Sequence, residues 1–479
     1  MINEKYNELF TLWVKENYDR IIERWIGLVK IPSVKSEAAK CAPFGENCSK
    51  ALNQSAMCFA LSGFNSEVFE TGGYAVVSYG EGDKKIGLFC HSDVVPASDD
   101  WLYTSAFEPI VKGGALIGRG VEDNKAGIIA SLCVLEFFKE NNIPLKNNIE
   151  VFIGSDEECG MKDMAEYLVE HTMPDISIVP DADFPCSVGE KGIFHFWLES
   201  QNSFKDIIDF CGGEAFNIVL DSATVTIKYN EDLFNELKFK AENDSSFAVY
   251  KENSMIILKA KGVAKHASIP EGSINAAYLC AKLLSECVNL NSNDKTILTA
   301  TVTALSSYYG NGIGVDHEDE NFGKTTAVNG MVKVADNKKL CLSFDVRYGD
   351  TLSAEKLEED ISLTANKLGF VVTDKNNSQG FSIDKDSKIP SLLEDVFFEV
   401  TGERLNRVLM SGGTYARKLN NAFSIGTSYI TFDRKDKVLK MPEGHGGPHQ
   451  CDEMIDIEGF FMATRILMNY IIACDEFLG

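Results

Sequence analysis

Aspartate, glutamate and histidine, residue types that bind divalent cations, recur in short segments beside apolar runs, and Asp123 is central among them. Asp123 lies in Gly-Arg-Gly-Val-Glu-Asp-Asn-Lys-Ala-Gly, residues 118–127, between the apolar Ala115–Ile117 and a helical pattern of apolar residues. The glycines permit a tight turn and the helix anchors it, so the carboxylate can be held in one direction. Taken alone, the segment also fits a polar loop in which Asp123 caps a helix, and the rest of the chain decides between the two.

His91 and Asp93 follow another apolar run, Ile86–Cys90, which predicts a buried strand. Side chains alternate along an extended chain, so His91 and Asp93 share one face. There the carboxylate can accept the second ring proton of the imidazole, which directs the other ring nitrogen toward a metal. The alternative is a structural histidine at the end of a strand.

Further acidic residues stand directly after two more apolar runs. Glu157 and Glu158 follow Ile149–Ile153, and Asp181 follows Ile176–Val179. In an open, mostly parallel α/β sheet, the carboxyl ends of the strands meet at the edge where sites form. Neighbouring glutamates usually form a solvated pair, but like charges crowded at one edge repel each other unless a cation lies among them. The three strand ends together therefore favour a metal site.

The pattern of predicted strands and helices changes twice along the chain. Apolar strands alternate with helical segments over residues 1–187, and this pattern returns at residues 389–479. Residues 188–388 mix strand-like and helical runs and are entered and left through polar turns. We therefore expect an α/β catalytic domain, discontinuous in sequence, with a mostly parallel mixed sheet flanked by helices. The insert is expected to be an α+β lid domain of two halves.

Composition excludes several classes of protein. The 479 residues are 44% hydrophobic and 24% charged, which suits two or three globular domains. The net charge of -25 argues against nucleic acid and membrane partners, because binding phosphate needs an excess of lysine and arginine. Met1–Tyr6 contain no basic region followed by an apolar run, and no run approaches the ~18 apolar residues of a membrane span. Thirteen cysteines without a Cys-x-x-Cys pair indicate reduced thiols, so we expect a cytoplasmic protein.

Seven motifs occur in one order along the chain: His-x-Asp at 91–93, Gly-Arg-Gly-x-x-Asp-x-Lys at 118–125, Glu-Glu at 157–158, Pro-Asp-Ala-Asp-Phe-Pro at 180–185, Gly-x-x-x-His at 262–266, Gly-Gly-Thr-Tyr-Ala-Arg at 412–417 and His-Gln-x-x-Glu at 449–453. In these the chain resembles the dinuclear zinc metallopeptidase family of bacterial dipeptidase V, carnosinase-like dipeptidases, aminoacylase and succinyl-diaminopimelate desuccinylase. The resemblance covers nearly the whole chain. The long insert, with Gly-Gly-x-Ala-x-Asn at 212–217, is most similar to the dipeptidase V branch.

The resemblance implies a site for two divalent ions, zinc or alternatively manganese. Asp123 would bridge them, and the remaining ligands would be Glu158 with His449 on one ion and His91 with Asp181 on the other. Such a pair of ions would share a water, lower its pKa and polarise the scissile carbonyl. His445 is a rival to His449 as a ligand, although the His-Gln-x-x-Glu context follows His449.

The resemblance also implies catalytic roles outside the ligand set. Glu157 would be the general base that activates the water and passes its proton to the leaving amine. Asp93 would orient His91. His266 would reach from the insert and donate to the oxyanion. The bond between Asp123 and Asn124 is expected to be cis, as in the family.

Four further residues are expected to bind substrate: Asn217, Arg347, Gly413 and Arg417. Asn217 and Arg347 would be contacts from the lid, and Arg417 a clamp for the C-terminal carboxylate, since a guanidinium fork fits a carboxylate bidentately. For each arginine, a structural salt bridge is the alternative.

Asp181, where other members have glutamate, resembles members that take a free α-amino group. A dipeptidase acting on small dipeptides with a free N-terminus is therefore the expected function. The alternatives are an N-acyl-amino-acid deacylase or carboxypeptidase of the same family, and a catalytically silent binding protein. Shorter members resemble dimers that share a lid histidine between subunits, but the insert here is roughly doubled, so we expect a monomer whose His266 serves its own chain.

Overall fold

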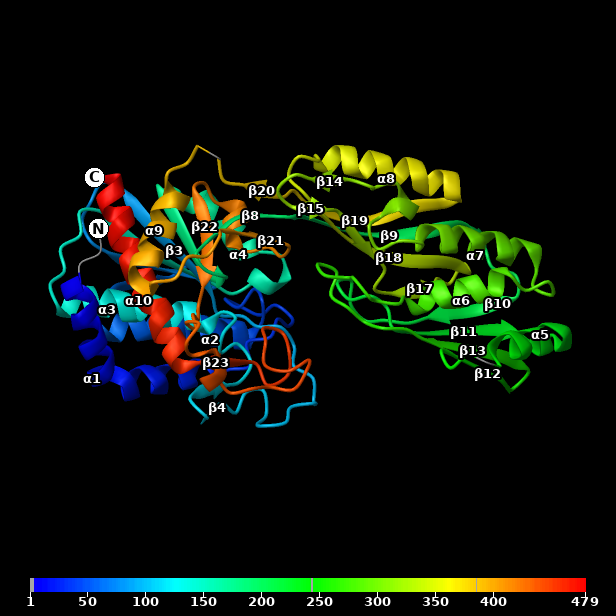
Figure 1. Ribbon diagram of the computed structural model, residues 1–479, viewed down its shortest axis with the longest axis horizontal. Helices are drawn as coiled ribbons and strands as arrows, with labels where there is room; N and C mark the ends of the chain where they lie inside the picture. The colour runs from blue at the N-terminus through cyan, green and yellow to red at the C-terminus, as the bar shows by residue number, and fades with distance from the viewer. Residues whose placement is uncertain (1–3, 243, 385) are drawn as a thin grey trace. The chain divides into compact units, whose positions relative to one another are not determined.

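The computed structural model describes residues 4–242, 244–384 and 386–479, which form two compact units (Figure 1). The first unit consists of three segments of the chain, Met1–Gly189, Ile383–Met410 and Thr414–Gly479. The second unit consists of Glu190–Ser382 with Ser411–Gly413. Each unit encloses its own cluster of buried apolar side chains, which is what allows a domain to be stable by itself.

A mixed sheet forms the centre of the first unit. Its middle strands are parallel neighbours, in the order β6 (Asn148–Gly154), β3 (Lys85–His91), β7 (Ile176–Ala182) and β22 (Ala422–Gly426). Antiparallel strands flank them, β2 (Tyr74–Tyr79) and β1 (Asn65–Val68) beyond β6 and β8 (Ser187–Glu190) beyond β22, and β21 (Val408–Met410) pairs with β8. The middle strands are mostly apolar and almost wholly buried, as is typical of strands covered by helices on both faces. The expected mixed α/β sheet is confirmed.

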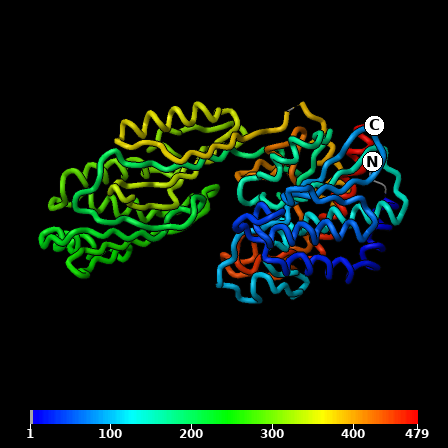
Figure 2. Tube along the Cα trace, turned by 180° about the vertical axis from the view of Figure 1, so that it is seen from behind, coloured from blue at the N-terminus to red at the C-terminus, as the bar shows by residue number. Residues whose placement is uncertain are grey.

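Six helices belong to this unit: α1 (Glu4–Val29), α2 (Glu46–Leu61), α3 (Lys125–Glu140), α4 (Lys162–Glu170), α9 (Ile389–Thr401) and α10 (Ile457–Leu478). Helix α3 packs on β3 and β7, and α10 packs on α3 and α9. Helices α1 and α10 contact each other, and the blue and red ends of the trace lie on the same side of this unit (Figure 2). The N-terminal and C-terminal parts of the sequence thus complete one core, which makes the unit discontinuous in sequence.

Helix α10 is the one helix among the described residues that is long and apolar enough to cross a membrane, and 72% of its most apolar window is buried inside the protein. Arg465 interrupts its apolar run. Helices α3 and α9 cover it, so in this fold α10 is a core helix.

A small sheet ties the Asp123 loop to the last part of the chain. Strand β5 (Ala115–Ile117) pairs antiparallel with both β4 (Ile110–Lys112) and β23 (Met454–Asp456). Because β5 and β23 are antiparallel, the chain leaving β5 toward Asp123 meets the chain entering β23 from His449. The backbone N–H of Gly118 donates to the carbonyl of Glu453 at 2.9 Å. Two motifs far apart in sequence are therefore brought together by backbone pairing.

The second unit consists of two antiparallel sheets with helices, as expected for an α+β insert of two halves. One sheet has the order β16 (Thr326–Val328), β18 (Lys339–Tyr348), β9 (Gly192–Ser203) and β19 (Phe370–Ser378), with β17 (Val332–Val334) beside β18. The other has the order β10 (Ile207–Cys211), β11 (Ser222–Lys228), β13 (Met255–Lys261) and β12 (Phe247–Glu252). The helices of this unit are α5 (Glu231–Ala241), α6 (Ala276–Ser285), α7 (Ser292–Ala304) and α8 (Ala354–Leu368).

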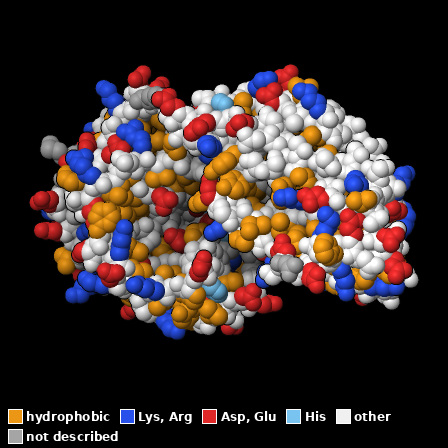
Figure 3. Space-filling view, turned by 45° about the vertical axis from the view of Figure 1, so that its right-hand side comes forward, with side chains coloured by type: hydrophobic (Ala, Val, Ile, Leu, Met, Phe, Trp, Pro, Cys, Tyr) orange, Lys and Arg blue, Asp and Glu red, His pale blue; other side chains and the backbone are white. Residues whose placement is uncertain are grey.

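Short elements complete the two units: β14 (Glu318–Asp319), β15 (Gly323–Lys324), β20 (Phe381–Ser382) and the 3-10 turns η1 (Glu157–Cys159), η2 (Asn311–Ile313), η3 (Tyr415–Lys418) and η4 (Lys435–Lys437). On the face that Figure 3 shows, lysine and arginine side chains are interleaved with aspartate and glutamate. This pattern agrees with the acidic composition, because the visible cations do not gather into a surface for phosphate.

Candidate metal centre

Three parallel strands deliver the predicted ligands to one edge of the first sheet. Strand β3 ends at His91, β6 runs into the η1 turn that carries Glu157 and Glu158, and β7 carries Asp181 near its end. Because β6, β3 and β7 are adjacent and parallel, their carboxyl ends lie together. The sequence placed these residues at strand ends, and the strand order explains why they meet.

Asp123 stands between two histidines, with one carboxylate oxygen toward each. Its Oδ1 is 3.0 Å from Nε2 of His91, and its Oδ2 is 3.1 Å from Nε2 of His449. On the first side, Asp181 Oδ2 lies 3.5 Å from the same His91 nitrogen. On the second side, Glu158 Oε2 lies 3.1 Å from the same His449 nitrogen. The arrangement is two half-sites, each with one histidine and one carboxylate, joined by Asp123.

The donor set fits divalent cations. Nε2 of His91 and Oε1 of Glu157 are buried without a hydrogen-bond partner in the described ranges of the chain, although carboxylate oxygens stand near that nitrogen. Ligand atoms of His91, Glu157 and Asp181 lie within 4.8 Å of one another, as do those of His91, Asp123 and Glu158. Imidazole nitrogen and carboxylate oxygen at such spacing are ligands of zinc and manganese.

The charges of the cluster also call for a cation. Burial raises the pKa of Glu158 to about 7, and the negative charge of Asp123 adds to the shift. Burial raises the pKa of Glu157 and of Asp181 as well, again with help from neighbouring carboxylates. Burial would lower the pKa of His449, but contacts with Asp123 and Glu158 outweigh it and raise that pKa to about 11. Crowded carboxylates therefore favour positive charge among them, whether a proton or a metal supplies it.

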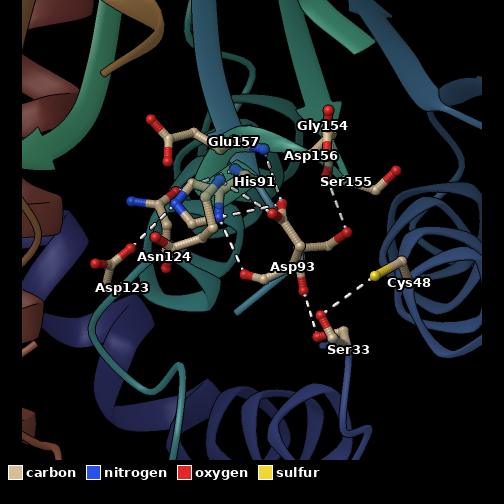
Figure 4. A network of polar contacts seen from close by, with 12 residues as sticks. Ser33, Cys48, His91, Asp93, Asp123, Asn124, Gly154, Ser155, Asp156 and Glu157 are labelled. Carbon is tan, nitrogen blue, oxygen red and sulfur yellow. Dashed lines mark hydrogen bonds and ion pairs between the residues drawn. The ribbon is translucent and has the colours of Figure 1, made fainter. Parts of the chain in front are cut away.

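Asp93 connects His91 to the turn that carries the glutamates (Figure 4). Its carboxylate accepts the backbone N–H groups of Glu157 at 3.3 Å and Glu158 at 3.1 Å. His91 Nδ1 donates to the backbone carbonyl of Asp93 at 3.1 Å, whereas the carboxylate is 3.5 Å away. The sequence predicted that the carboxylate would take this proton, and the structure gives that task mainly to the carbonyl. The outcome for His91 is the same, since a protonated Nδ1 leaves Nε2 with its lone pair for a metal.

Glu453 holds the Asp123 loop in place, a role that the sequence did not reveal. Its carboxylate accepts the backbone N–H of Gly120 at 3.0 Å, of Glu122 at 3.1 Å and of Asp123 at 3.2 Å. The same carboxylate forms a buried ion pair with Arg119 at 2.7 Å. The spacing His-Gln-x-x-Glu marked Glu453 as part of a motif but gave no partner for it.

Arg119 extends this support to the second histidine. Its guanidinium donates to the backbone carbonyl of His449 at 3.2 Å as well as to Glu453. One buried pair therefore fixes both the loop of Asp123 and the backbone of His449, so these groups are held before any ligand arrives.

Asn124 links the ends of two strands, β3 and β7. Its amide donates to the carbonyl of Pro180 and, at 3.0 Å, to Oδ1 of Asp181, and its oxygen accepts the N–H of His91 at 3.3 Å. The peptide bond between Asp123 and Asn124 is cis, which confirms the expectation.

His445, the rival ligand, has a different partner. Its Nδ1 lies 2.6 Å from Oδ2 of Asp452, and that carboxylate also accepts the N–H groups of Leu102 and Tyr103. This network joins two loops near the small sheet. The preference for His449 agrees with the geometry, because His449 is the histidine beside Asp123 and Glu158.

The expected lid residues His266 and Asn217 lie together in the second unit. The Asn217 amide is 3.5 Å from Nε2 of His266. The backbone N–H of Ser268 donates to Nδ1 of His266 at 3.2 Å. Both ring nitrogens of His266 therefore face hydrogen-bonding groups of its own unit.

Arg347, also in the second unit, forms the salt bridge that the sequence left open as the alternative. Its Nε lies 2.6 Å from Oδ1 of Asp345, a second nitrogen donates to Oδ2 at 2.8 Å, and a third donates to the carbonyl of Ser411 at 2.9 Å. The side chain is 7% exposed. A substrate contact for Arg347 stays a prediction.

The Gly-Gly-Thr-Tyr-Ala-Arg motif is divided between the units. Gly413 is grouped with the second unit, and Arg417 lies in the η3 turn of the first. Tyr415 between them is buried and donates to Asp163 at 2.6 Å, and Asp163 accepts the N–H of Ser155. The motif therefore has a structural function in the first unit, while the substrate roles of Gly413 and Arg417 stay predictions.

Replacing Glu453 with alanine is expected to lower the free energy of unfolding by about 3–5 kcal/mol, because Arg119 is left buried without its partner. The measurement is urea denaturation followed by tryptophan fluorescence. Glu458→Ala is the control, since Glu458 pairs with Arg434 but is 75% exposed, and an exposed pair contributes at most ~1 kcal/mol. Equal losses in the two variants would contradict the supporting role of Glu453.

Comparison with known proteins agrees with this geometry. The model of peptidase family M20/M25/M40 matches residues 87–473. A provisionally named dipeptidase of Staphylococcus aureus (strain MRSA252) is 28% identical over 473 residues, which cover 96% of this chain and 97% of that protein. Human carnosine dipeptidase 1 has the same fold, at 14% identity and a TM-score of 0.62, with 98% of this chain and 99% of that chain covered. So does the di-peptidase Dug1p of Saccharomyces cerevisiae, at 12% identity and a TM-score of 0.61, with 99% of each chain covered. The chain therefore belongs to peptidase family M20/M25/M40, as expected, and is a metal-dependent hydrolase acting on peptide bonds.

Proposed function

We propose that this protein is a dipeptidase that uses two divalent cations to hydrolyse small dipeptides with a free N-terminus. The observation that carries the proposal is Asp123, whose two carboxylate oxygens each face one histidine. A carboxylate so placed can be shared by two cations, and each cation would have two further ligands of its own. A single structural ion would not need this symmetry.

His91 and Asp181 would hold one cation, and His449 and Glu158 the other, with Asp123 common to both. When bound, cations at such a site polarise the scissile carbonyl and make a water more acidic, which is the chemistry that peptide hydrolysis requires. Zinc is the expected metal and manganese the alternative, because both accept mixed nitrogen and oxygen ligands.

Glu157 is proposed as the general base. Its Oε1 is buried without a hydrogen-bond partner in the described residues, so it keeps a lone pair that can accept a proton. Burial raises the pKa of its carboxyl, with the negative charges of Asp181 and Glu158 adding to the shift and His91 opposing it. A raised pKa makes a carboxylate a stronger base, and the proton it takes can then pass to the leaving amine.

Recognition of the two termini of the dipeptide is assigned to Asp181 and Arg417. Asp181 resembles the aspartate of family members that accept a free α-amino group, and the guanidinium of Arg417 would bind the C-terminal carboxylate. The name of the Staphylococcus aureus relative supports the same substrate class. Closer kinship with the dipeptidase V branch stays a prediction.

The test is a substrate panel with purified protein and added zinc or manganese. It compares free dipeptides, the same dipeptides acetylated at the N-terminus, and longer peptides. We expect hydrolysis of the free dipeptides only, together with two metal ions per chain by elemental analysis. Preference for the acetylated substrates would identify a deacylase, trimming of long peptides a carboxypeptidase, and no hydrolysis a silent binding protein.

His266 is proposed as the donor to the oxyanion, with the second unit acting as a lid within one chain. This role needs an N–H at Nε2, which is the tautomer in which Nδ1 accepts the backbone N–H of Ser268. We expect His266→Ala to keep its metals and lose ~100- to 1,000-fold in turnover.

Mixing two inactive variants tests whether the protein acts as a monomer. If each chain uses its own His266, a mixture of His266→Ala and Glu157→Gln remains inactive. Recovery of activity in the mixture, or a stable dimer that presents His266 to its neighbour, would show that the site is shared between chains.

We also place the protein in the cytoplasm. All thirteen cysteines are free thiols, nine of them buried, and such thiols persist where the compartment is reducing. Detection in the periplasmic or extracellular fraction of the source cells would contradict this placement.

A further inference from the structure

The second unit contains a cavity of about 450 Å³ that no step of the proposed reaction uses. Its walls come from several separate parts of that unit. Helix α6, the loop after α7, and strands β16 and β18 all contribute. The apolar and aromatic side chains that matter here are Val219, Tyr278, Leu279, Tyr308, Val328 and Phe344. A volume of this size with mainly apolar and aromatic walls is typical of small-molecule sites.

The backbone around the cavity is held by its own hydrogen bonds. Asn275 caps α6 by accepting the N–H of Tyr278 at 2.9 Å, and its amide donates to the carbonyl of Asn329 at 3.0 Å. The N–H of Ala327 donates to the carbonyl of Tyr308 at 2.7 Å, which fixes the loop against β16. The walls are therefore formed in advance, and a ligand would not need to order them.

Polar groups at the cavity are few. The hydroxyl groups of Tyr278, Tyr308, Ser273 and Ser306 have no hydrogen-bond partner in the described parts of the chain. They can bind the polar end of a ligand whose larger part is apolar. Among the described residues, no charged side chain lines the cavity, which disfavours phosphate and other ions.

The cavity shares a wall with the segment that carries His266. The buried Ala267, next to His266 in sequence, packs with Val219 and Val328, and Tyr308 packs against the same cluster. Both backbone polar groups of Ala267 are hydrogen-bonded. Its N–H donates to the backbone carbonyl of Asn217 at 2.8 Å, and its carbonyl accepts from the Thr326 hydroxyl at 2.8 Å. A group that fills the cavity therefore contacts the side chains that position His266 and Asn217.

Exposed apolar side chains surround the same segment. Ile218 is 45% exposed, Ile269 is 68% exposed and Ile274, which also lines the cavity, is 46% exposed. Ile218 pairs with His266 and Ile274 with Val263 in isolated bridges, so both flank that segment.

We propose that this cavity binds the side chain of an aromatic or large aliphatic amino acid. Two sources can supply that side chain: the dipeptide substrate, whose residue would enter the cavity while His266 and Asn217 contact its backbone, or a free amino acid released by hydrolysis. The first source rests on the proposed function, and the second does not.

The first arm of the test measures kcat/KM for Phe-Ala, Ala-Phe and Ala-Ala. It compares the wild type with Ser306→Trp, which places a large ring at the cavity from an exposed position. If the cavity takes a substrate side chain, one phenylalanine substrate loses at least ~10-fold relative to Ala-Ala in the variant, the scale of losing a hydrophobic pocket. Unchanged ratios exclude the substrate as the source.

The second arm measures binding of free L-phenylalanine and L-leucine to the whole protein by calorimetry. It needs no turnover, so it remains informative if the panel finds no dipeptidase activity. Saturable binding in the wild type that is lost in Ser306→Trp supports the cavity as a site for free amino acids. Unchanged kcat/KM ratios combined with no such binding would overturn the proposal.

Two further variants guard against a general loss of structure. Tyr308→Ala removes one wall of the cavity and should weaken whichever arm is positive. Tyr250→Ala is the matched control, since Tyr250 lies on β12, is 38% exposed and does not line the cavity. An equal effect of the two substitutions, with melting temperatures unchanged, would also overturn the proposal.

Discussion

Replacing Asp123 with asparagine is expected to abolish hydrolysis, with a loss in kcat/KM on the order of 10,000-fold, equivalent to about 5.5 kcal/mol. Asparagine has the same shape, so the loop that Glu453 holds should keep its path. What is lost is one negative charge and one of the two oxygens, because an amide nitrogen does not bind a metal. Since the two oxygens face His91 and His449 separately, the substitution damages both half-sites at once.

The measurement combines steady-state kinetics with elemental analysis of the dialysed variant. We expect fewer than two ions per chain and no recovery when zinc or manganese is added in moderate excess. Asp183→Asn is the matched control. Asp183 is an exposed aspartate two residues from Asp181, and its substitution removes the same charge. Its activity should remain within ~3-fold of the wild type, as for a surface substitution. Two tightly held ions in Asp123→Asn would show that Asp123 does not bridge.

Local patterns were enough to predict the strands that carry the ligands. The apolar runs at 86–90, 149–153 and 176–179 became β3, β6 and β7, each within a few residues of the expected ends. Such runs are easily recognised because central strands of a parallel sheet are buried on both faces. Once the strands are parallel neighbours, chain direction alone brings their following residues to one edge. The fold class and the meeting of these acidic residues and His91 at one edge could therefore be predicted before any contact was known.

The supporting groups could not be predicted in this way. Glu453 accepts three backbone N–H groups from a loop about 330 residues earlier, and nothing in the intervening sequence indicates that pairing. Asn124 bonds to two different strand ends for reasons that depend on the order of strands in the sheet. Buried polar groups find partners through tertiary structure, so their roles appear only when the fold is known.

One pairing was within reach of the sequence. Asp345 and Arg347 are two residues apart on β18, so their side chains lie on the same face of the strand. A short acidic and a long basic side chain so placed can pair bidentately, which they do. The resemblance to the family led instead to a substrate role for Arg347, and only a variant assayed for KM can decide whether the residue has both functions.

Glu157→Gln is expected to lower turnover by ~100- to 10,000-fold while both metals remain bound. The substitution keeps the backbone N–H that donates to Asp93, so the turn and its neighbour Glu158 stay in place. It also keeps the size of the side chain in a buried position. The change is chemical: a buried carboxylate with a raised pKa can take a proton, and an uncharged amide cannot.

The comparison with Glu158→Gln separates the two adjacent glutamates. Glu158 lies 3.1 Å from the His449 nitrogen, so its substitution should cost metal as well as turnover. Glu157→Gln should lose turnover alone, with KM nearly unchanged, because the base acts on the transition state more than on substrate binding. The two variants need only one dialysis, one elemental analysis and one progress curve each. If Glu157→Gln loses a metal and Glu158→Gln keeps both, the roles of the two residues are reversed, and the base of this hydrolase is the glutamate that contacts His449.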